Sequence, residues 1–242
     1  MLQTEEPYWL EEAYSQAIAG SDTGLVQRNL QLANVSSCLL WHLFHGTGRY
    51  LDAAGGVGLF TRLMRDMGFD YYWWDPNAHN VLARGFESLP QSGSFVAVTA
   101  FEVLEHLTDP VKFLMDLRLH AGCNTLIAST ELYGGEAAPG TDWWYYAFDT
   151  GQHVSFYQRR TLELIGRKLQ LTLYSHRNIH VWTDRQLPNL WFRIMTQPRH
   201  AARLARWPRS RMQSRVTSDS ELLARAAVNT GSSSRLAGSA GE

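Results

Sequence analysis

The sequence predicts an α/β fold with a doubly wound, mostly parallel sheet, an antiparallel hairpin at the sheet edge and an N-terminal helical extension. Three observations support this prediction. Strand and helix patterns alternate through the middle of the chain, a glycine-rich turn follows the first of these strands, and two short β-like runs close the series. With 242 residues, of which 45% are hydrophobic, the chain can build one main core.

The individual elements follow from residue spacing. Apolar residues at helical spacing indicate helix within residues 5–45, with a polar break at 20–24. We expect strands at 49–52, 71–75, 95–101 and 125–129, and helices at 59–67, 110–120 and 161–169. Thr161 is the expected N-cap of the last helix. The run 171–182 predicts the closing antiparallel pair, with its turn at 175–178.

These elements divide the chain into four parts. They are a helical cap or lid (1–45), the central α/β domain (46–185), a helical, arginine-rich extension (186–229) and a disordered tail (230–242). Residues 199–215 contain six arginines and no acid. This pattern predicts a solvated face, or else a surface for anionic lipid or for the phosphate of a nucleotide sugar. The tail is rich in Gly, Ser and Ala and has little to bury.

Composition excludes several classes of function. A formal net charge of -1 provides no global basic field, so no nucleic-acid partner is expected. Cys38 and Cys123 lack disulfide-like or metal-like spacing, so we expect a reducing cytoplasmic location and no metal. The sequence has neither a signal-peptide pattern nor an apolar run of about 20 residues. It therefore predicts no transmembrane segment and at most weak contact with a membrane surface.

The strand that ends at Asp52 runs directly into Gly55-Gly56-Val57-Gly58 and then into a helix, so a ligand can approach the backbone closely. A dinucleotide site requires G-x-G-x-x-G and places a pyrophosphate on the helix N-terminus. Here Thr61 occupies the third glycine position, and Asp52 would bring negative charge near that phosphate. S-adenosylmethionine (SAM) carries an ammonium and a sulfonium instead, so a carboxylate favours it.

The next strand also ends in an acid. Asp75 lies 23 positions after Asp52, where its two carboxylate oxygens can accept both hydroxyls of an adenosine ribose. An Asp-Pro turn with Pro76, or a helix N-cap, is the structural alternative.

Three segments together resemble a known family: LDAAGGVGLFTRLMRDMGFDYYWWDPN, FVAVTAFEVLEHLTDP and GQHVSFYQRRTLELIGRKL. They are similar to class I SAM-dependent methyltransferases, which have a Rossmann-like fold. Within that superfamily they resemble the bacterial branch of ubiquinone-type O-methyltransferases that accompany surface-polysaccharide synthesis. The resemblance covers about residues 49–175 and implies that the central domain binds SAM.

The resemblance also implies a cofactor site. The expected cofactor-binding residues are Asp52, Ala54, Gly56, Gly58, Asp75, Pro76, Ala100, Phe101 and Glu102. Of these, Ala54 departs from the family pattern, which has glycine at that position. The family usually has an acidic residue after the third strand that contacts the adenine. This sequence has no clear counterpart, and Glu87 or Ser88 is the candidate for that position.

Transfer of a methyl group to a hydroxyl requires alignment and removal of a proton. The candidate bases are Glu102, Glu105, His106, Glu131 and His153, and we expect catalytic roles for His153, His106 and Glu102. A role in tying down the local structure is the alternative for each histidine. The candidate substrate contacts are Trp143, Trp144, Tyr145 and Tyr14, with loop packing as their alternative.

The sequence therefore predicts a SAM-dependent enzyme that methylates a hydroxyl of a saccharide, a lipid-linked saccharide or another small molecule. Two alternatives stay open. The chain could be a non-catalytic partner subunit that binds SAM, which the alanine at position 54 keeps possible, or an NAD(P)-dependent oxidoreductase, which the missing third glycine disfavours.

Overall fold

The computed structural model describes residues 1–4, 7–9, 23–89 and 91–238, with side chains as far as residue 228. Its strands are β1 (Leu2–Gln3), β2 (Arg49–Ala53), β3 (Asp70–Trp74), β4 (Ala97–Ala100), β5 (Thr125–Ser129), β6 (Ser155–Phe156), β7 (Thr172–His176) and β8 (Ile179–Thr183). Its helices are α2 (Leu25–Phe44), α3 (Leu59–Asp66), α4 (Pro110–Ala121), α5 (Arg159–Leu169), α6 (Asn189–Met195), α7 (Pro198–Leu204), α8 (Arg206–Arg211) and α9 (Val216–Gly238), with 3-10 turns η1 (Leu104–His106) and η2 (Trp144–Tyr146).

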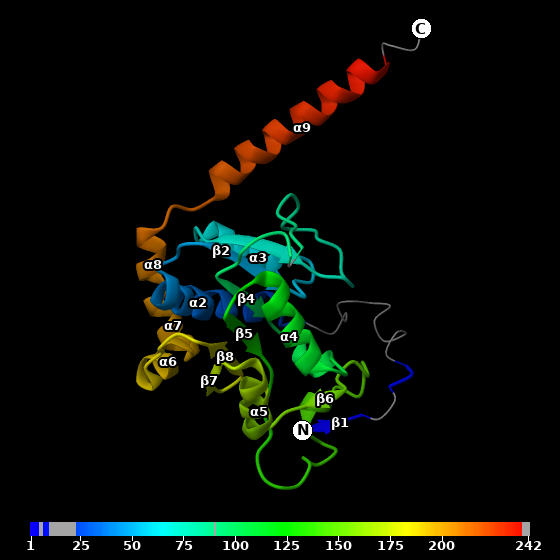
Figure 1. Ribbon diagram of the computed structural model, residues 1–242, viewed down its shortest axis with the longest axis vertical. Helices are drawn as coiled ribbons and strands as arrows, with labels where there is room; N and C mark the ends of the chain where they lie inside the picture. The colour runs from blue at the N-terminus through cyan, green and yellow to red at the C-terminus, as the bar shows by residue number, and fades with distance from the viewer. Residues whose placement is uncertain (5–6, 10–22, 90, 239–242) are drawn as a thin grey trace.

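A six-stranded sheet forms the centre of the molecule, in the order β3-β2-β4-β5-β8-β7 (Figure 1). Strands β3, β2, β4 and β5 are parallel, whereas β8 is antiparallel to both β5 and β7. A separate two-stranded sheet joins β1 to β6. The structure confirms the predicted α/β class, with its mostly parallel sheet and antiparallel edge hairpin.

Helices cover both faces of the sheet, because successive strand side chains point to opposite sides. Tyr50 packs with α2, α3, α6 and α7 on one face. Its neighbour Leu51 packs with α4 and α5 on the other. Both faces of the central strands are therefore dry, and a ligand can approach them only at an end of the sheet.

The boundaries of the predicted strands and of the helices from α3 to α5 lie within two residues of the prediction, but the predicted helix cap was wrong. Helix α5 begins at Arg159 with Gln158 as its N-cap, so Thr161 lies inside the first turn and does not cap the helix. Strand β4 covers only Ala97–Ala100, because Phe95 and Val96 bond to Ala121 and Arg49 as loop residues before it. The predicted N-terminal helix is present as α2, whereas residues 10–22 lie outside the described part of the chain.

The C-terminal extension forms α6, α7 and α8 along one side of the molecule, and α9 projects from it (Figure 1). We expected residues 230–242 to be disordered, but the structure continues α9 to Gly238. Among the described residues, no helix is both long and apolar enough to cross a membrane.

One buried ion-pair cluster attaches α9 to the domain. The carboxylate of Asp219 accepts hydrogen bonds from Arg65 Nη2 at 2.7 Å, Arg65 Nε at 2.8 Å and Arg62 Nη2 at 2.8 Å. Arg65 is 3% exposed and Asp219 is 4% exposed. All α9 side chains described after Asp219, at positions 220–228, are exposed. Asp219 is therefore the only buried side chain of α9 within residues 216–228.

This arrangement predicts unequal effects of changes in α9. Asp219→Ala leaves the Arg65 guanidinium buried without its main partner and should lower the free energy of unfolding by about 3 kcal/mol. Glu221→Ala breaks only an exposed pair with Arg225 and should change it by less than about 0.5 kcal/mol. Deletion of residues 230–242 should also leave stability unchanged. Urea unfolding of the three variants tests this, and equal stability of Asp219→Ala and wild type would contradict it.

Candidate active site

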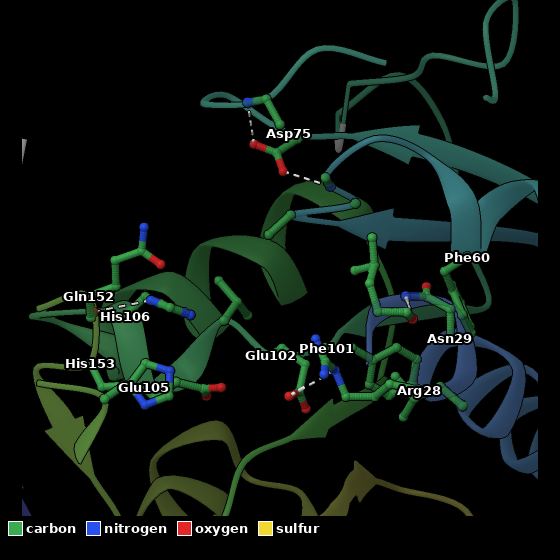
Figure 2. A pocket seen from close by; sticks show the side chains of 18 of the residues that line it. Arg28, Asn29, Phe60, Asp75, Phe101, Glu102, Glu105, His106, Gln152 and His153 are labelled. Carbon is green, nitrogen blue, oxygen red and sulfur yellow. Dashed lines mark hydrogen bonds and ion pairs between the residues drawn. The ribbon is translucent and has the colours of Figure 1, made fainter. Parts of the chain in front are cut away.

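A cavity of about 820 Å³ opens at the edge of the sheet where the parallel strands β2, β3 and β4 end. Its walls come from the start of α2, the loop between β2 and α3, the residues after β3 and β4, and the segment 144–153. Figure 2 shows side chains from these separate segments turned toward a shared space. The carboxyl ends of parallel strands are the usual ligand site in open α/β sheets.

Asp52 lies at the bottom of this cavity and is 2% exposed. Its carboxylate accepts hydrogen bonds from the Thr61 hydroxyl at 2.9 Å and the Thr99 hydroxyl at 3.2 Å. Burial raises the pKa of Asp52 to about 7, although the two hydroxyls oppose that rise. A buried carboxylate of this kind is stabilised in its charged form by a cationic ligand group.

The loop after Asp52 depends on backbone angles that favour glycine. Gly56 and Gly58 have φ angles of 54° and 84°, and Ala54 has a φ of 58°. An alanine in this left-handed region carries a penalty of about 1 kcal/mol relative to glycine. Ala54 nevertheless lines the cavity, as Gly56 does.

Gly58, predicted as a cofactor contact, does not line the cavity. It precedes α3, and a Cβ atom there would lie 2.6 Å from Asn80 Oδ1 and 3.0 Å from the backbone nitrogen of Ala83. Glycine at this position is therefore required by packing against residues 80–83.

Asp75 follows β3 directly and lines the cavity. One of its oxygens accepts the N–H groups of Asn77 at 2.8 Å and Ala78 at 3.0 Å, which is the local turn considered as an alternative. The other accepts the Gly56 N–H at 2.9 Å. This carboxylate thus connects the turn after β3 to the glycine loop after β2. Pro76 is exposed and lies outside the cavity lining.

Phe101 and Glu102 follow β4 and reach the cavity, whereas Ala100 stays buried in the strand. Glu102 has a φ of 51°, a strained conformation for a glutamate. The Ser129 hydroxyl accepts the Glu102 N–H at 2.8 Å and donates to its carboxylate at 2.5 Å. Arg28 of α2 forms an ion pair with the second carboxylate oxygen at 3.5 Å. These contacts hold Glu102 in the middle of the cavity (Figure 2).

His106 and His153 lie together at one side of the cavity, with ring centroids 4.8 Å apart. His106 Nδ1 is 3.1 Å from the Gln152 carbonyl, and His153 Nδ1 is 2.7 Å from the Tyr145 carbonyl. Burial lowers the pKa of His106 to about 4, and repulsion from the protonated form of His153 acts in the same direction. Burial also lowers the pKa of His153. Both imidazoles are therefore neutral at pH 7 and able to accept a proton or bind a ligand.

Two further carboxylates border the cavity. Glu105 is 1% exposed, and its Oε2 atom has no hydrogen-bond partner. Burial and the charge of Glu102 raise the pKa of Glu105 to about 8. The same two causes raise the pKa of Glu131. The structure thus brings all five candidate bases into one cavity.

The aromatic residues 143–145 have different surroundings: two line the cavity and one packs against other rings. Trp144 and Tyr145 line the cavity, and Trp144 remains 74% exposed. Trp143 does not, because its ring packs against Tyr145 at 5.3 Å and Phe156 at 5.7 Å. Trp143 is therefore loop packing, as the alternative interpretation held.

Other sequence expectations fall outside this site. Glu87 accepts hydrogen bonds from Asn80 and Gly85, and neither Glu87 nor Ser88 lines the cavity. Tyr14 lies outside the described residues. Conversely, Gln152 and Asn178 line the cavity without having been predicted. No motif marks Asn178, which reaches the cavity only because the turn between β7 and β8 lies against the end of β5.

The arginine-rich extension packs along α2 and does not line the cavity. Arg28 lines the cavity, whereas Trp41 of the same helix contacts Trp207 of α8 at 5.5 Å. At 1.5 Å per residue, these two positions of α2 are separated by about 20 Å. Arg209 of α8 lies closer, since it donates a hydrogen bond to Asn34 of α2 at 3.1 Å, but no arginine of α7 or α8 lines the cavity.

Comparison with known proteins identifies the class. The family described as methyltransferase domain matches residues 25–176, more than half of the chain, so the chain belongs to this family. It is accordingly a SAM-dependent methyltransferase and not a nicotinamide-dependent oxidoreductase. No curated protein matches the chain in sequence.

Solved structures show the same kind of fold at low identity. Magnesium protoporphyrin IX methyltransferase (ChlM) from Synechocystis PCC 6803 with bound SAM is 16% identical, with a TM-score of 0.44 over 74% of this chain and 94% of that one. TnmH is 13% identical, with a TM-score of 0.50 over 72% and 61% of the two chains. An O-methyltransferase family protein from Burkholderia thailandensis is 12% identical, with a TM-score of 0.47 over 72% and 62%.

The raised pKa of Asp52 predicts a pH dependence of SAM binding. The carboxyl of the free protein is mostly protonated at pH 6, and a cationic ligand favours its ionised form, so binding should release close to one proton. Affinity should therefore increase as the pH rises through about 7. Calorimetry at pH 6 in two buffers with different ionisation enthalpies measures the proton directly. The Asp52→Asn variant should release none, and a wild-type enthalpy that is independent of buffer would contradict the assignment.

Proposed function

We propose that this methyltransferase transfers the methyl group of SAM to a hydroxyl oxygen of a small molecule, with a saccharide as the favoured acceptor. The observation that carries this proposal is the neutral pair His106 and His153, which lies in the same cavity as the glycine loop and Asp75. Figure 2 shows Asp75 on one side of that cavity and the histidine pair on another. A cofactor and an acceptor can thus meet between them.

The glycine side of the cavity fits SAM. The Asp52 carboxylate is buried and favours a cationic group, and Gly56 leaves the backbone open to close approach. Asp75 already accepts three N–H groups, and a carboxylate has about four lone-pair positions, so it can accept a ribose hydroxyl as well. We assign Asp52, Gly56 and Asp75 to the cofactor. SAM, when bound there, supplies a methyl group on a positively charged sulfur.

The histidine side of the cavity fits an acceptor. In each histidine, a backbone carbonyl takes the Nδ1–H, and this leaves the basic lone pair on Nε2. A neutral imidazole near a hydroxyl can take its proton as the oxygen forms its bond to the methyl group. Glu102 lines the same cavity, where it can orient the hydroxyl by accepting a hydrogen bond.

The cavity wall also favours a ring-shaped acceptor. Trp144 offers an exposed indole at the lining, next to the buried ring of Tyr145. Aromatic faces of this kind pack against the apolar face of sugar rings and other flat molecules. No arginine of α7 or α8 lines the cavity, so the lining gives no support for a lipid-linked form of the acceptor.

A partner subunit that binds SAM without catalysis is the second candidate. The strained Ala54 favours it, because glycine would remove the strain while leaving the loop path unchanged. The two candidates differ in one respect: only an enzyme requires the histidine pair.

Replacement of His153 tests the proposed function. His153→Ala should reduce the turnover of radiolabelled methyl transfer to sugar or cell-extract acceptors by about 100-fold or more, because it removes a group that activates the acceptor. Affinity for SAM should change little, since His153 lies on the acceptor side. His120→Ala, an exposed histidine at the end of α4, is the matched control and should keep full turnover.

The result also separates the candidates. Equal losses of turnover and SAM affinity in His153→Ala would assign this histidine to structure and contradict its role. Intact SAM binding by wild type with no methyl transfer to any acceptor fraction would favour the partner subunit.

A further inference from the structure

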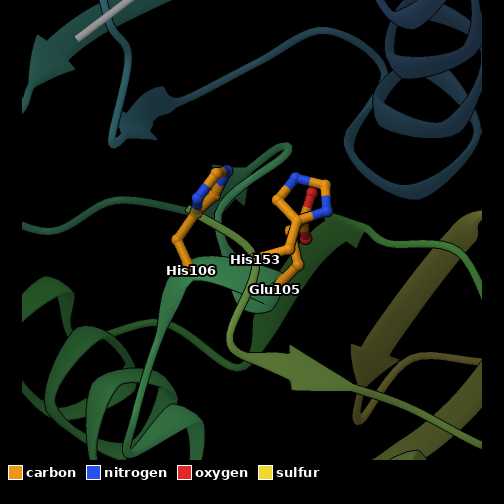
Figure 3. A group of neighbouring side chains, drawn as sticks. All are labelled: Glu105, His106 and His153. Carbon is orange, nitrogen blue, oxygen red and sulfur yellow. The ribbon is translucent and has the colours of Figure 1, made fainter. Parts of the chain in front are cut away.

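Three side chains with metal-binding chemistry meet at the acceptor side of the cavity. Glu105, His106 and His153 each present one donor atom, and these atoms all lie within 4.8 Å of one another. Figure 3 shows the two imidazoles and the carboxylate converging from two segments, η1 and the loop before β6. The sequence predicted no metal, because the two cysteines have no metal-like spacing, and the two histidines and Glu105 were considered only as candidate bases.

The surroundings of both histidines are those of metal ligands. A histidine that binds a metal through one ring nitrogen almost always donates the other N–H to a carbonyl or carboxylate. Here Nδ1 of His106 is held by the Gln152 carbonyl at 3.1 Å, and Nδ1 of His153 by the Tyr145 carbonyl at 2.7 Å. These contacts fix the orientation of each ring and place the coordinating lone pair on Nε2.

Glu105 supplies the negative charge. Its side chain is buried, and its Oε2 atom has no hydrogen-bond partner. Burial of a carboxylate oxygen without a partner is costly unless a cation or a proton compensates it. Without a metal a proton provides this compensation, and an ion bound between the three groups would take the place of that proton.

The two segments that carry the ligands are also held together. The Val154 N–H donates to the Glu105 carbonyl at 2.8 Å, and the Ser155 hydroxyl donates to the Leu107 carbonyl at 2.6 Å. These bonds join the residues next to His153 to those next to His106. A preformed frame of this kind lowers the cost of bringing the three ligands together.

We propose that Glu105, His106 and His153 bind one divalent transition-metal ion, of the zinc class, at the acceptor side of the cavity. Two imidazoles with one carboxylate are an established ligand set for such ions, and they leave coordination positions open. The ligand atoms of a tetrahedral zinc ion lie about 3.4 Å apart. The donor atoms of this group lie within 4.8 Å of one another, so small side-chain rotations that shorten these distances by up to about 1.4 Å would complete the site.

The role of this ion rests on the proposed function. An ion with open positions toward the cavity would hold the acceptor hydroxyl and lower its pKa, and the proton would pass to the Glu102 carboxylate or to water, because both imidazoles would be occupied by the metal. In that case His106 and His153 act on the acceptor through the metal. Metal binding itself does not depend on the proposed function.

Equilibrium dialysis of the full chain tests the site without SAM or acceptor. After chelator treatment, the protein is titrated with Zn²⁺ alone and with Co²⁺ alone, and bound metal is measured by atomic emission. Wild type should bind one ion per chain, and bound Co²⁺ should give visible absorption from its coordination to imidazole. Loss of a group outside the ligand set typically weakens metal affinity about 10–100-fold, so Glu105→Gln and His153→Ala should weaken it by more than about 100-fold.

The control is again His120→Ala, which should bind metal as wild type does. Thermal melting of Glu105→Gln, a variant of nearly the same shape, distinguishes loss of the ligand from loss of the fold. Wild type that binds no more metal than Glu105→Gln, or variants that all bind equally, would overturn the proposal. A metal-free protein that binds SAM and transfers methyl at the full rate would overturn the role of the ion while leaving the proposed function intact.

Discussion

The parallel pairing of β2 with both β3 and β4 is the constraint on which the site depends. In this register Asp52 lies opposite Trp73 of β3 and Thr99 of β4, so all three strands end at the same edge of the sheet. The glycine loop, Asp75 and Glu102 follow these ends directly. The hydrogen bond from the Gly56 N–H to Asp75 then joins two of the three ends. Without this pairing, residues far apart in sequence would not share a cavity.

Local patterns were sufficient to predict this edge. The strand that ends at Asp52, the glycines after it and the acid after the next strand each have a strong local signal, because backbone geometry requires them. Positions 54 and 56, predicted to contact the cofactor, both line the cavity. Gly58 was assigned to the ligand by analogy. In the structure a side chain at this position would clash with residues 80–83, and no local sequence pattern reveals that contact.

Features produced by tertiary contacts were not predictable in the same way. Asn178 reaches the cavity through a hairpin turn, and Trp143 turns into an aromatic cluster while its neighbour Trp144 stays exposed. The convergence of Glu105 and His106 with His153 depends on the bonds between the segments that carry them. Residue type suggested each as a candidate base, but only the fold shows that they form a group.

Buried ionisable groups in this cavity are costly to the fold, and this cost is informative. Asp52 and Glu105 are both nearly inaccessible to water, and burial raises the pKa of each. Glu102 and Ala54 adopt backbone angles that non-glycine residues avoid. Strain and perturbed pKa values gather at functional sites, since a ligand of complementary charge recovers part of the cost. Their coincidence at one sheet edge supports the assignment of the cavity.

The most direct test of this account is the affinity for SAM, measured by titration calorimetry on wild type, Asp75→Ala and Glu87→Ala. Wild type should bind SAM, and Asp75→Ala should weaken binding by about 10-fold or more, because it removes the proposed hydrogen bond to a ribose hydroxyl and the bond that holds the Gly56 N–H. Glu87→Ala removes a nearby acid outside the cavity lining and should bind as wild type does. Wild type without affinity for SAM, or equal affinity in all three proteins, would contradict the account.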